Sequence, residues 1–191
     1  MPNKNQNTGL DSVDVSVLEA LQEDGRLSIA QLARRVQRSQ AAVHARLRRL
    51  ERDGFIRKYA ALVDRDKMGF DLLCLVHVNL QLHQPEHVER FRAAVRDMPE
   101  VLECHHVTGE FDYLLKVVSR NREDLERFVV GRLTPIAEVA RIHTSVVLRE
   151  VKSTTSLPLG RIEPPRKGKG TEGSMDSKGG KGRRASKDRR R

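Results

Sequence analysis

Residues 28–55 constrain the fold of this chain more than any other stretch, because they specify two short helices separated by a tight turn. Apolar residues recur at helical spacing on both sides of that turn, at Ile29, Leu32, Ala33 and Val36 and again at Val43, Leu47 and Leu50. Ser28 can cap the first helix, with Gln31 three residues on completing a capping box. Ser39 can cap the second helix, which Gly54 then ends. The stretch therefore predicts two short helices with defined boundaries.

The second of these helices is predicted to bind DNA. Residues 34–58 hold nine Lys or Arg and two acids, a net charge of +7. Each phosphate neutralised by such a surface releases condensed counterions and so adds affinity. The alternative is a solvated basic helix in an ordinary helical domain. Under the DNA hypothesis, Gln40 and His44 are predicted to contact base edges, and Ser39 and Ala41 lie beside them at the same DNA-binding surface. The candidates for phosphate are Arg38, Arg46, Arg48, Arg49 and Arg52.

A third helix is predicted before this pair, in LDSVDVSVLEALQEDGR. Asp11 can cap this helix, and the negative charge of Asp14 in its first turn interacts favourably with the helix dipole. The helix is expected to end at Gly25. Residues 1–9 are polar and are expected to be disordered. Residues 10–55 thus form a three-helix, winged helix-turn-helix domain, the smallest unit that holds a recognition helix in place. Residues 56–68 are rich in β-formers and are interpreted as a linker strand.

Residues 69–152 predict a second domain with the order β-α-β-β-α-β. In DLLCLVHVNLQLH the even positions from Leu72 to Leu82 are apolar and the later odd ones polar, which indicates a strand with one buried face. Pro85 opens a helix, the strands VLECHHVT and FDYLLKVVS flank a turn at Gly109, and Asn121 caps a second helix. A final strand is expected at about 139–151. This order is typical of the α+β ferredoxin-like fold, and apolar residues on the far face of its sheet favour a second copy as cover: Leu73, Leu75 and Val147.

The charge of the chain is concentrated at its C-terminal end. Of the net +10, residues 158–191 supply twelve Lys or Arg against four acids, whereas residues 61–157 carry a net charge of −2. The tail 158–191 is rich in Gly, Lys and Arg and is expected to be disordered. No stretch resembles a membrane span or a signal peptide, which predicts a cytoplasmic, nucleoid-associated protein. Cys74 and Cys104 are interpreted as reduced, buried thiols.

Three segments together resemble the Lrp/AsnC, or feast/famine, family of transcriptional regulators. They are LDSVDVSVLEALQEDGR, the 39–54 helix with its ending ARLRRLERDGFI, and ECHHVTGEFDYLLKV. The resemblance runs from about Leu10 to Lys152. It implies homodimers built by the C-terminal domains, often assembled into octamers, with an amino acid or related small molecule bound where dimers meet. At the helix turn the family usually has Gly and then an apolar residue, whereas this chain has Gln37, which must accept positive φ, and Arg38.

The resemblance also implies which residues respond to the effector. The turn Thr108-Gly109-Glu110-Phe111-Asp112-Tyr113 matches the family's effector-responsive turn, and Thr144, Ser145 and Val146 match the segment of the last strand that faces it. A glycine turn lets backbone groups approach a zwitterion, and Asp112 can accept from its ammonium group. The alternative is that Gly109 only permits a tight hairpin and that Asp112 bonds its own backbone. Ser145 stands where some members of the family have a larger aromatic residue. The size of the ligand pocket can therefore differ, and the resemblance does not identify the effector.

No enzyme, cofactor or metal site is predicted. His105 and His106 lie beside Cys104, but neighbours on a strand point to opposite faces and cannot bind one ion together. The sequence therefore favours a sequence-specific transcriptional regulator that responds to an amino acid or related metabolite. The alternative is an architectural, nucleoid-type protein that coats DNA with little sequence preference, using the basic tail as a main binding element.

Overall fold

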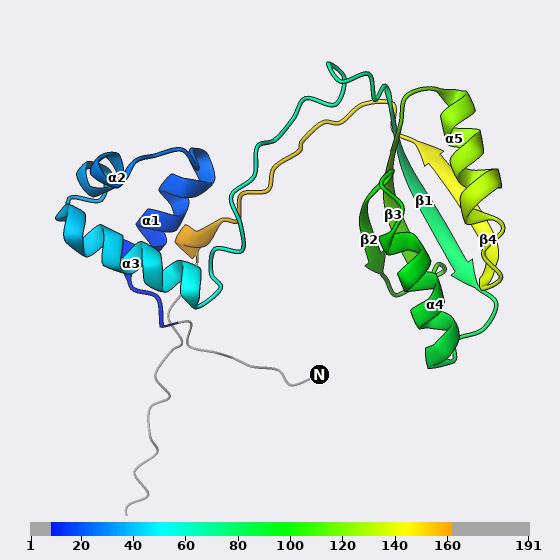
Figure 1. Ribbon diagram of the computed structural model, residues 1–191, viewed down its shortest axis with the longest axis horizontal. Helices are drawn as coiled ribbons and strands as arrows, with labels where there is room; N and C mark the ends of the chain where they lie inside the picture. The colour runs from blue at the N-terminus through cyan, green and yellow to red at the C-terminus, as the bar shows by residue number, and fades with distance from the viewer. Residues whose placement is uncertain (1–8, 162–191) are drawn as a thin grey trace, which may run out of the picture.

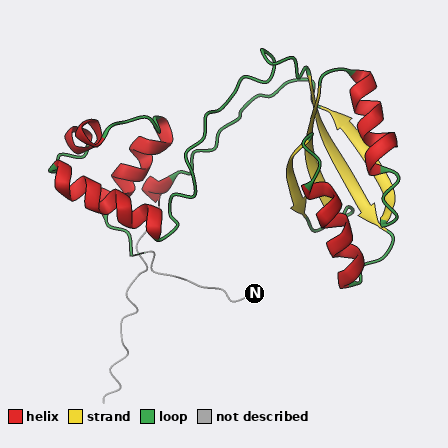
Figure 2. Ribbon diagram, in the orientation of Figure 1, coloured by secondary structure: helices red, strands yellow, loops and turns green. Residues whose placement is uncertain are grey.

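The computed structural model describes residues 9–161, which form two domains joined by extended segments (Figure 1). The expected disorder of residues 1–8 and 162–191 lies outside the described residues. The N-terminal domain contains α1 (Ser12–Glu23), α2 (Ile29–Arg35) and α3 (Gln40–Arg52). The strands found within residues 9–161 all belong to the C-terminal domain (Figure 2).

The predicted caps of the three N-terminal helices are confirmed. Asp11 and Asp14 form a reciprocal capping box at the start of α1, and Ser28 and Gln31 form another at the start of α2. The Ser39 hydroxyl accepts a hydrogen bond of 3.3 Å from the Ala42 N–H at the start of α3. Gly54 follows α3 with φ of +78°, a left-handed conformation that glycine adopts without a steric penalty.

The three helices share a small aliphatic core, as their periodicity predicts. Val17 and Ala20 of α1, Leu32 of α2, and Val43 and Leu50 of α3 are all 0–1% exposed. Burying a side chain of this size stabilises a fold by about 1.5–3 kcal/mol. This core fixes the orientation of α3, because its two buried residues lie on the side opposite its polar face.

The C-terminal domain has the predicted ferredoxin-like order. Its elements are β1 (Leu72–Leu80), α4 (Pro85–Arg96), β2 (Val101–His106), β3 (Tyr113–Ser119), α5 (Arg122–Phe128), the π-helical turn η1 (Val129–Leu133) and β4 (Val139–Val146). The strands form one antiparallel sheet in the order β2-β3-β1-β4. Both helices pack on one face of it, where Phe91 of α4 and Phe128 of α5 meet Val76, Leu115 and Val117.

The opposite face of the sheet carries no helix of the described chain. Leu75 and Val147 lie on it with part of their surface exposed, while Leu73 is 4% exposed. Lys116 lies on the same face between Glu103 and Glu150, at 3.6 and 3.9 Å from their carboxylates. This face is therefore a mixed apolar and charged surface.

Both connections between the domains differ from the predicted strands. Residues 57–64 are extended but join no sheet in the described chain, and no wing strand follows α3. Leu62 and Val63 are 80% and 69% exposed. A strand needs backbone hydrogen bonds to a neighbour, and residues 57–64 make none with another segment of the described chain. For the same reason β4 ends at Val146 and not at residue 151. The last backbone hydrogen bond between the two strands runs from the Val147 N–H to the Leu73 carbonyl of β1.

Two further expectations are corrected. Cys74 is buried but Cys104 is exposed, because it lies on the edge strand β2. The segment expected to be disordered from residue 158 keeps its structure to residue 161, as the short 3-10 turn η2 (Leu159–Arg161). No helix within residues 9–161 is long and apolar enough to cross a membrane.

Candidate DNA and effector sites

The N-terminal half of α3 presents a polar, uncovered face. Gln40, Ala41, His44 and Arg48 are all exposed, whereas Val43 on the other side of the helix is 0% exposed. Small residues beside an amide and an imidazole allow close approach to a base edge, and the amide can bond adenine in two places. Gln40 and His44 are thus exposed on this face, and their base-contacting role stays a prediction.

The turn between α2 and α3 is basic and strained at one residue. Gln37 has φ of +52°, as the missing glycine predicts, and its carbonyl accepts from the Arg38 guanidinium at 2.9 Å. A left-handed conformation costs a residue with a Cβ atom roughly 1–2 kcal/mol. The turn borders an open hollow of about 600 Å³, whose lining includes Arg34, Arg38 and Ser39. Two guanidinium groups and a helix N-terminus suit a phosphate at this place.

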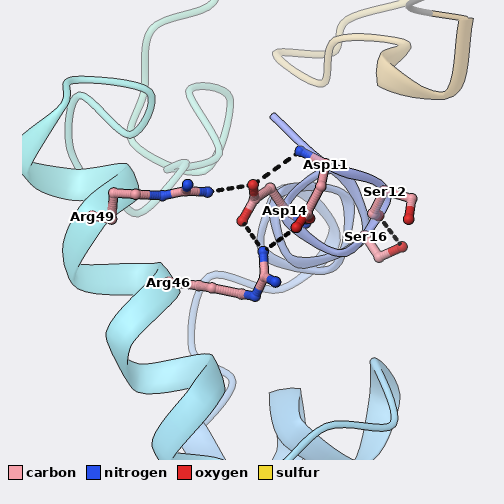
Figure 3. A network of polar contacts seen from close by, with 6 residues as sticks. All are labelled: Asp11, Ser12, Asp14, Ser16, Arg46 and Arg49. Atoms are coloured by element: carbon pink, nitrogen blue, oxygen red, sulfur yellow. Dashed lines mark hydrogen bonds and ion pairs between the residues drawn. The ribbon is translucent and has the colours of Figure 1, made fainter. Parts of the chain in front are cut away.

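A buried carboxylate in α1 clamps α3 (Figure 3). Asp14 is 0% exposed, and its side chain accepts from Arg46 at 2.8 Å and from Arg49. Asp11 accepts from the same Arg46 nitrogen at 2.6 Å. The hydrogen bond from the Asp14 N–H, together with Arg46, holds the pKa of Asp11 below its ordinary value, while the Asp14 and Asp11 carboxylates raise the pKa of Arg46. The clamp thus joins the first turn of α1 to the middle of α3.

The predicted phosphate contacts therefore fall into two groups. Arg38, Arg48 and Arg52 are exposed, and Arg52 pairs with the neighbouring Asp53 at 2.9 Å. Arg46 and Arg49 point toward α1, with only 28% and 38% of their side chains exposed. Periodicity cannot reveal the clamp, because it joins residues 32 and 35 positions apart.

The turn after β2 is held by its own side chains and by β1. One Asp112 carboxylate oxygen accepts from the Leu80 N–H at 2.8 Å, and the other contacts His83 Nε2 at 3.0 Å. Burial acts to raise the pKa of Asp112, but the bonds from Leu80 and His83 outweigh it, and the pKa lies below its ordinary value. Gly109 has φ of +120°, and the Glu110 carbonyl accepts from Asn79 at 2.8 Å. The carboxylate of Asp112 already has protein partners, although 22% of the side chain stays exposed.

An aromatic cluster lies beside this turn and was not predicted from the sequence. The rings of Phe111 and His77 are 4.6 Å apart between centroids, and His143 lies 5.8 Å from His77. His77 Nδ1 and Asn79 Oδ1 are buried without a hydrogen-bond partner among the described residues. Residues 77 and 143 are directly opposite each other in the β1–β4 ladder, and only the strand register could have shown that.

The two halves of the predicted effector site lie along the same strand, β1. Thr144, Ser145 and Val146 pair with Val76, Leu75 and Cys74. The turn at 108–113 lies beside the C-terminal half of β1, where Asp112 bonds Val78 and Leu80, and its Phe111 ring lies 6.1 Å from that of His143, the neighbour of Thr144. Thr108, Gly109 and Glu110 are exposed, whereas Tyr113 is 2% exposed and its hydroxyl accepts from Arg92 at 3.1 Å.

Comparisons with known proteins match both domains. Residues 10–57 match the family model described as winged helix-turn-helix DNA-binding, and residues 73–157 match the Lrp/AsnC ligand binding domain. A proline dehydrogenase transcriptional activator from Rhizobium radiobacter is 37% identical over 81% of this chain and 99% of its own length. The leucine-responsive regulatory protein of Salmonella typhimurium is 38% identical over 78% of this chain and 90% of its own.

A solved structure agrees with these sequence matches. The crystal structure of a transcriptional regulator from Neisseria meningitidis in complex with L-Met has a TM-score of 0.77 at 38% identity, covering 79% of this chain and 97% of that one. An AsnC family transcriptional regulator from Agrobacterium tumefaciens has a TM-score of 0.76 at 32% identity, covering 81% and 100%.

Proposed function

This chain belongs to the Lrp/AsnC family of transcriptional regulators, and we propose that it reads its DNA sites through Gln40 and His44 of α3. The observation that carries this proposal is the uncovered polar face of a helix that buried aliphatic contacts and the Asp14 clamp hold in place. Arg38, Arg48 and Arg52 supply the exposed phosphate contacts. The architectural alternative finds no support in the relatives that match.

Single substitutions in α3 test this assignment on DNA from upstream of the protein's own gene. Replacing Gln40 or His44 by Ala is expected to weaken binding to the specific site by about 1–3 kcal/mol and to leave random DNA unaffected. Arg48→Ala removes a phosphate contact and is expected to weaken binding to both DNAs by similar amounts. Arg96→Ala removes an exposed arginine of the C-terminal domain and is the matched control. Equal losses on both DNAs for the Gln40 and His44 variants would contradict the proposal.

For the C-terminal domain, we propose an amino acid or a related small metabolite as effector, bound between copies of the chain. The L-Met complex of the similar Neisseria regulator supports this class of ligand. Thr108, Gly109 and Glu110 are exposed, which leaves the turn open to a second copy and supports a site completed between copies. Thermal unfolding at fixed protein concentration, with each amino acid in turn, tests it, because a ligand of the folded oligomer raises the midpoint by mass action.

We further propose a homodimer formed through the open face of the sheet, assembling into larger species such as octamers. Part-exposed Leu75 and Val147, and the unpartnered buried atoms of His77 and Asn79, support an interface there. The cytoplasm, where chromosomal DNA lies, is the proposed compartment. Sedimentation of the chain across a range of concentrations measures the assembly directly.

A further inference from the structure

The last described residues of the chain contact the DNA-binding domain, although they follow the C-terminal domain in the sequence. After β4, residues 147–156 run back toward the three-helix domain (Figure 1). The side chain of Gln22 in α1 then holds the backbone of Leu157, donating to its carbonyl at 3.1 Å and accepting from its N–H at 2.6 Å. Leu159 packs with Val17, Leu18 and Leu50. These contacts of Leu157 and Leu159 form an anchor on α1.

Thirty further residues follow the anchor in the sequence. Residues 162–191 contain eleven Lys or Arg and four acids, a net charge of +7. The matched Lrp/AsnC ligand binding domain ends at residue 157. About four-fifths of this chain accounts for 99% of the Rhizobium relative and 100% of the Agrobacterium structure. The extension is therefore an addition to the architecture that these relatives share.

The extension has little acidic surface to pair with in the rest of this chain. Residues 11–24 hold five acids and no Lys or Arg, but three of these acids, Asp11, Asp14 and Glu23, are already paired with arginines of the same domain. The DNA-binding domain, residues 10–58, is itself positive, with ten Lys or Arg against seven acids. Residues 61–157 have a net charge of only −2. A polyanion is the complementary partner, and the nearest polyanion to α1 is DNA bound by α3 of the same domain. Thirty residues span at most roughly 100 Å when extended, which is enough to follow the backbone well beyond a half-site.

We propose that the anchor on α1 delivers residues 162–191 to the phosphate backbone beside the half-site occupied by the same chain. This inference rests on the DNA-binding function proposed above. The anchor matters because the local concentration of a tethered binder depends on where its tether begins. Without it, the tether would begin at Val147, at the end of the distant sheet. The extension thus adds affinity without adding sequence preference.

Salt titration tests the contribution of the extension. The full chain, a chain ending at Arg161 and a full-length variant with the eleven basic residues changed to Gln are compared on specific and random DNA between 50 and 200 mM salt. Three phosphate contacts contribute about 2.7 to the slope of log K against log salt, which is roughly a 40-fold change in affinity over this range. Both altered chains are expected to lose at least that slope and to keep their preference for the specific site. Equal slopes in all three proteins would overturn the inference. Loss of site preference by the full chain itself would instead contradict the proposed function.

Directed cleavage tests the anchor. An iron chelate is attached to Pro164→Cys in a Cys104→Ser background, since Cys104 is exposed and Cys74 is buried. We expect cleavage within about one turn of DNA from the outer edge of each half-site. Gln22→Ala removes both bonds to Leu157, and Leu159→Ala trims the packed side chain. Each is expected to spread and weaken the cleavage while the footprint of α3 is kept. An identical cleavage pattern in anchored and unanchored chains would refute the delivery role.

Discussion

Replacing Asp14 by Asn is the sharpest test of how the recognition helix is held. The substitution keeps the size of the side chain but removes the charge that Arg46 and Arg49 share. Leaving one partner of a fully buried ion pair unpaired costs about 3–5 kcal/mol. The two arginine side chains are 28% and 38% exposed, so water can solvate them in part. We therefore expect a loss of about 2–3 kcal/mol in the free energy of unfolding.

The loss should be confined to the N-terminal domain. One kcal/mol shifts the melting temperature of a small domain by about 4–8 °C. Far-UV circular dichroism should therefore show the helical transition of Asp14→Asn moving down by roughly 8–24 °C, while the sheet domain melts as before.

An exposed ion pair on the same helix provides the matched control. Glu23 of α1 pairs with Arg35, and their side chains are 64% and 46% exposed. Such pairs contribute about 0–1 kcal/mol, so Glu23→Gln should change the melting temperature little. If Asp14→Asn and Glu23→Gln proved equally stable, the clamp would not be what holds α3. A double-mutant cycle with Arg49→Gln would then show no coupling.

Three further changes have defined outcomes. Gln37→Gly relieves the left-handed strain at the helix turn and should stabilise the N-terminal domain by about 0.5–1 kcal/mol in urea unfolding; destabilisation would mean that the Gln37 side chain makes a needed contact. Because the pKa of Asp112 is lowered, its contribution to stability is complete above the ordinary carboxyl pKa of about 3.9 and is lost as the pH falls through the lowered value. Asp112→Asn should therefore flatten the stability of the sheet domain between pH 5 and 2, whereas the neighbouring Glu110→Gln should not; parallel pH curves for all three proteins would rule this out. Leu75→Lys places a charge on the open sheet face and should shift sedimentation toward the monomer, an outcome that Arg96→Lys on α4 should not produce.

The sequence predicted the elements whose signals are local. Asp11, Ser28, Ser39 and Asn121 cap the helices they were expected to cap, because a cap depends on residues three positions apart. The order of strands and helices in the C-terminal domain followed from periods of 2 and 3.6 residues. Strand ends were harder, because β4 stops where β1 has no further residue to bond it.

Charged residues were predicted less well than apolar ones, and the reason is physical. An apolar stripe predicts which side of a helix is buried. An arginine predicts no side, because it can bind a DNA phosphate from the solvent-exposed face or pair with a carboxylate inside the protein. Arg46 and Arg48 are two positions apart and so lie on nearly opposite sides of α3; Arg46, beside the buried stripe, reaches Asp14, whereas Arg48 is exposed. The phosphate role of Arg46 and Arg49 remains a prediction, and its test needs both binding and stability data, because replacing either arginine also removes a bond that holds α3 to α1. Affinity has to be measured together with stability. A substitution that weakens DNA binding without lowering the melting temperature identifies a residue that contacts DNA. One that lowers both identifies a residue that holds α3 in place.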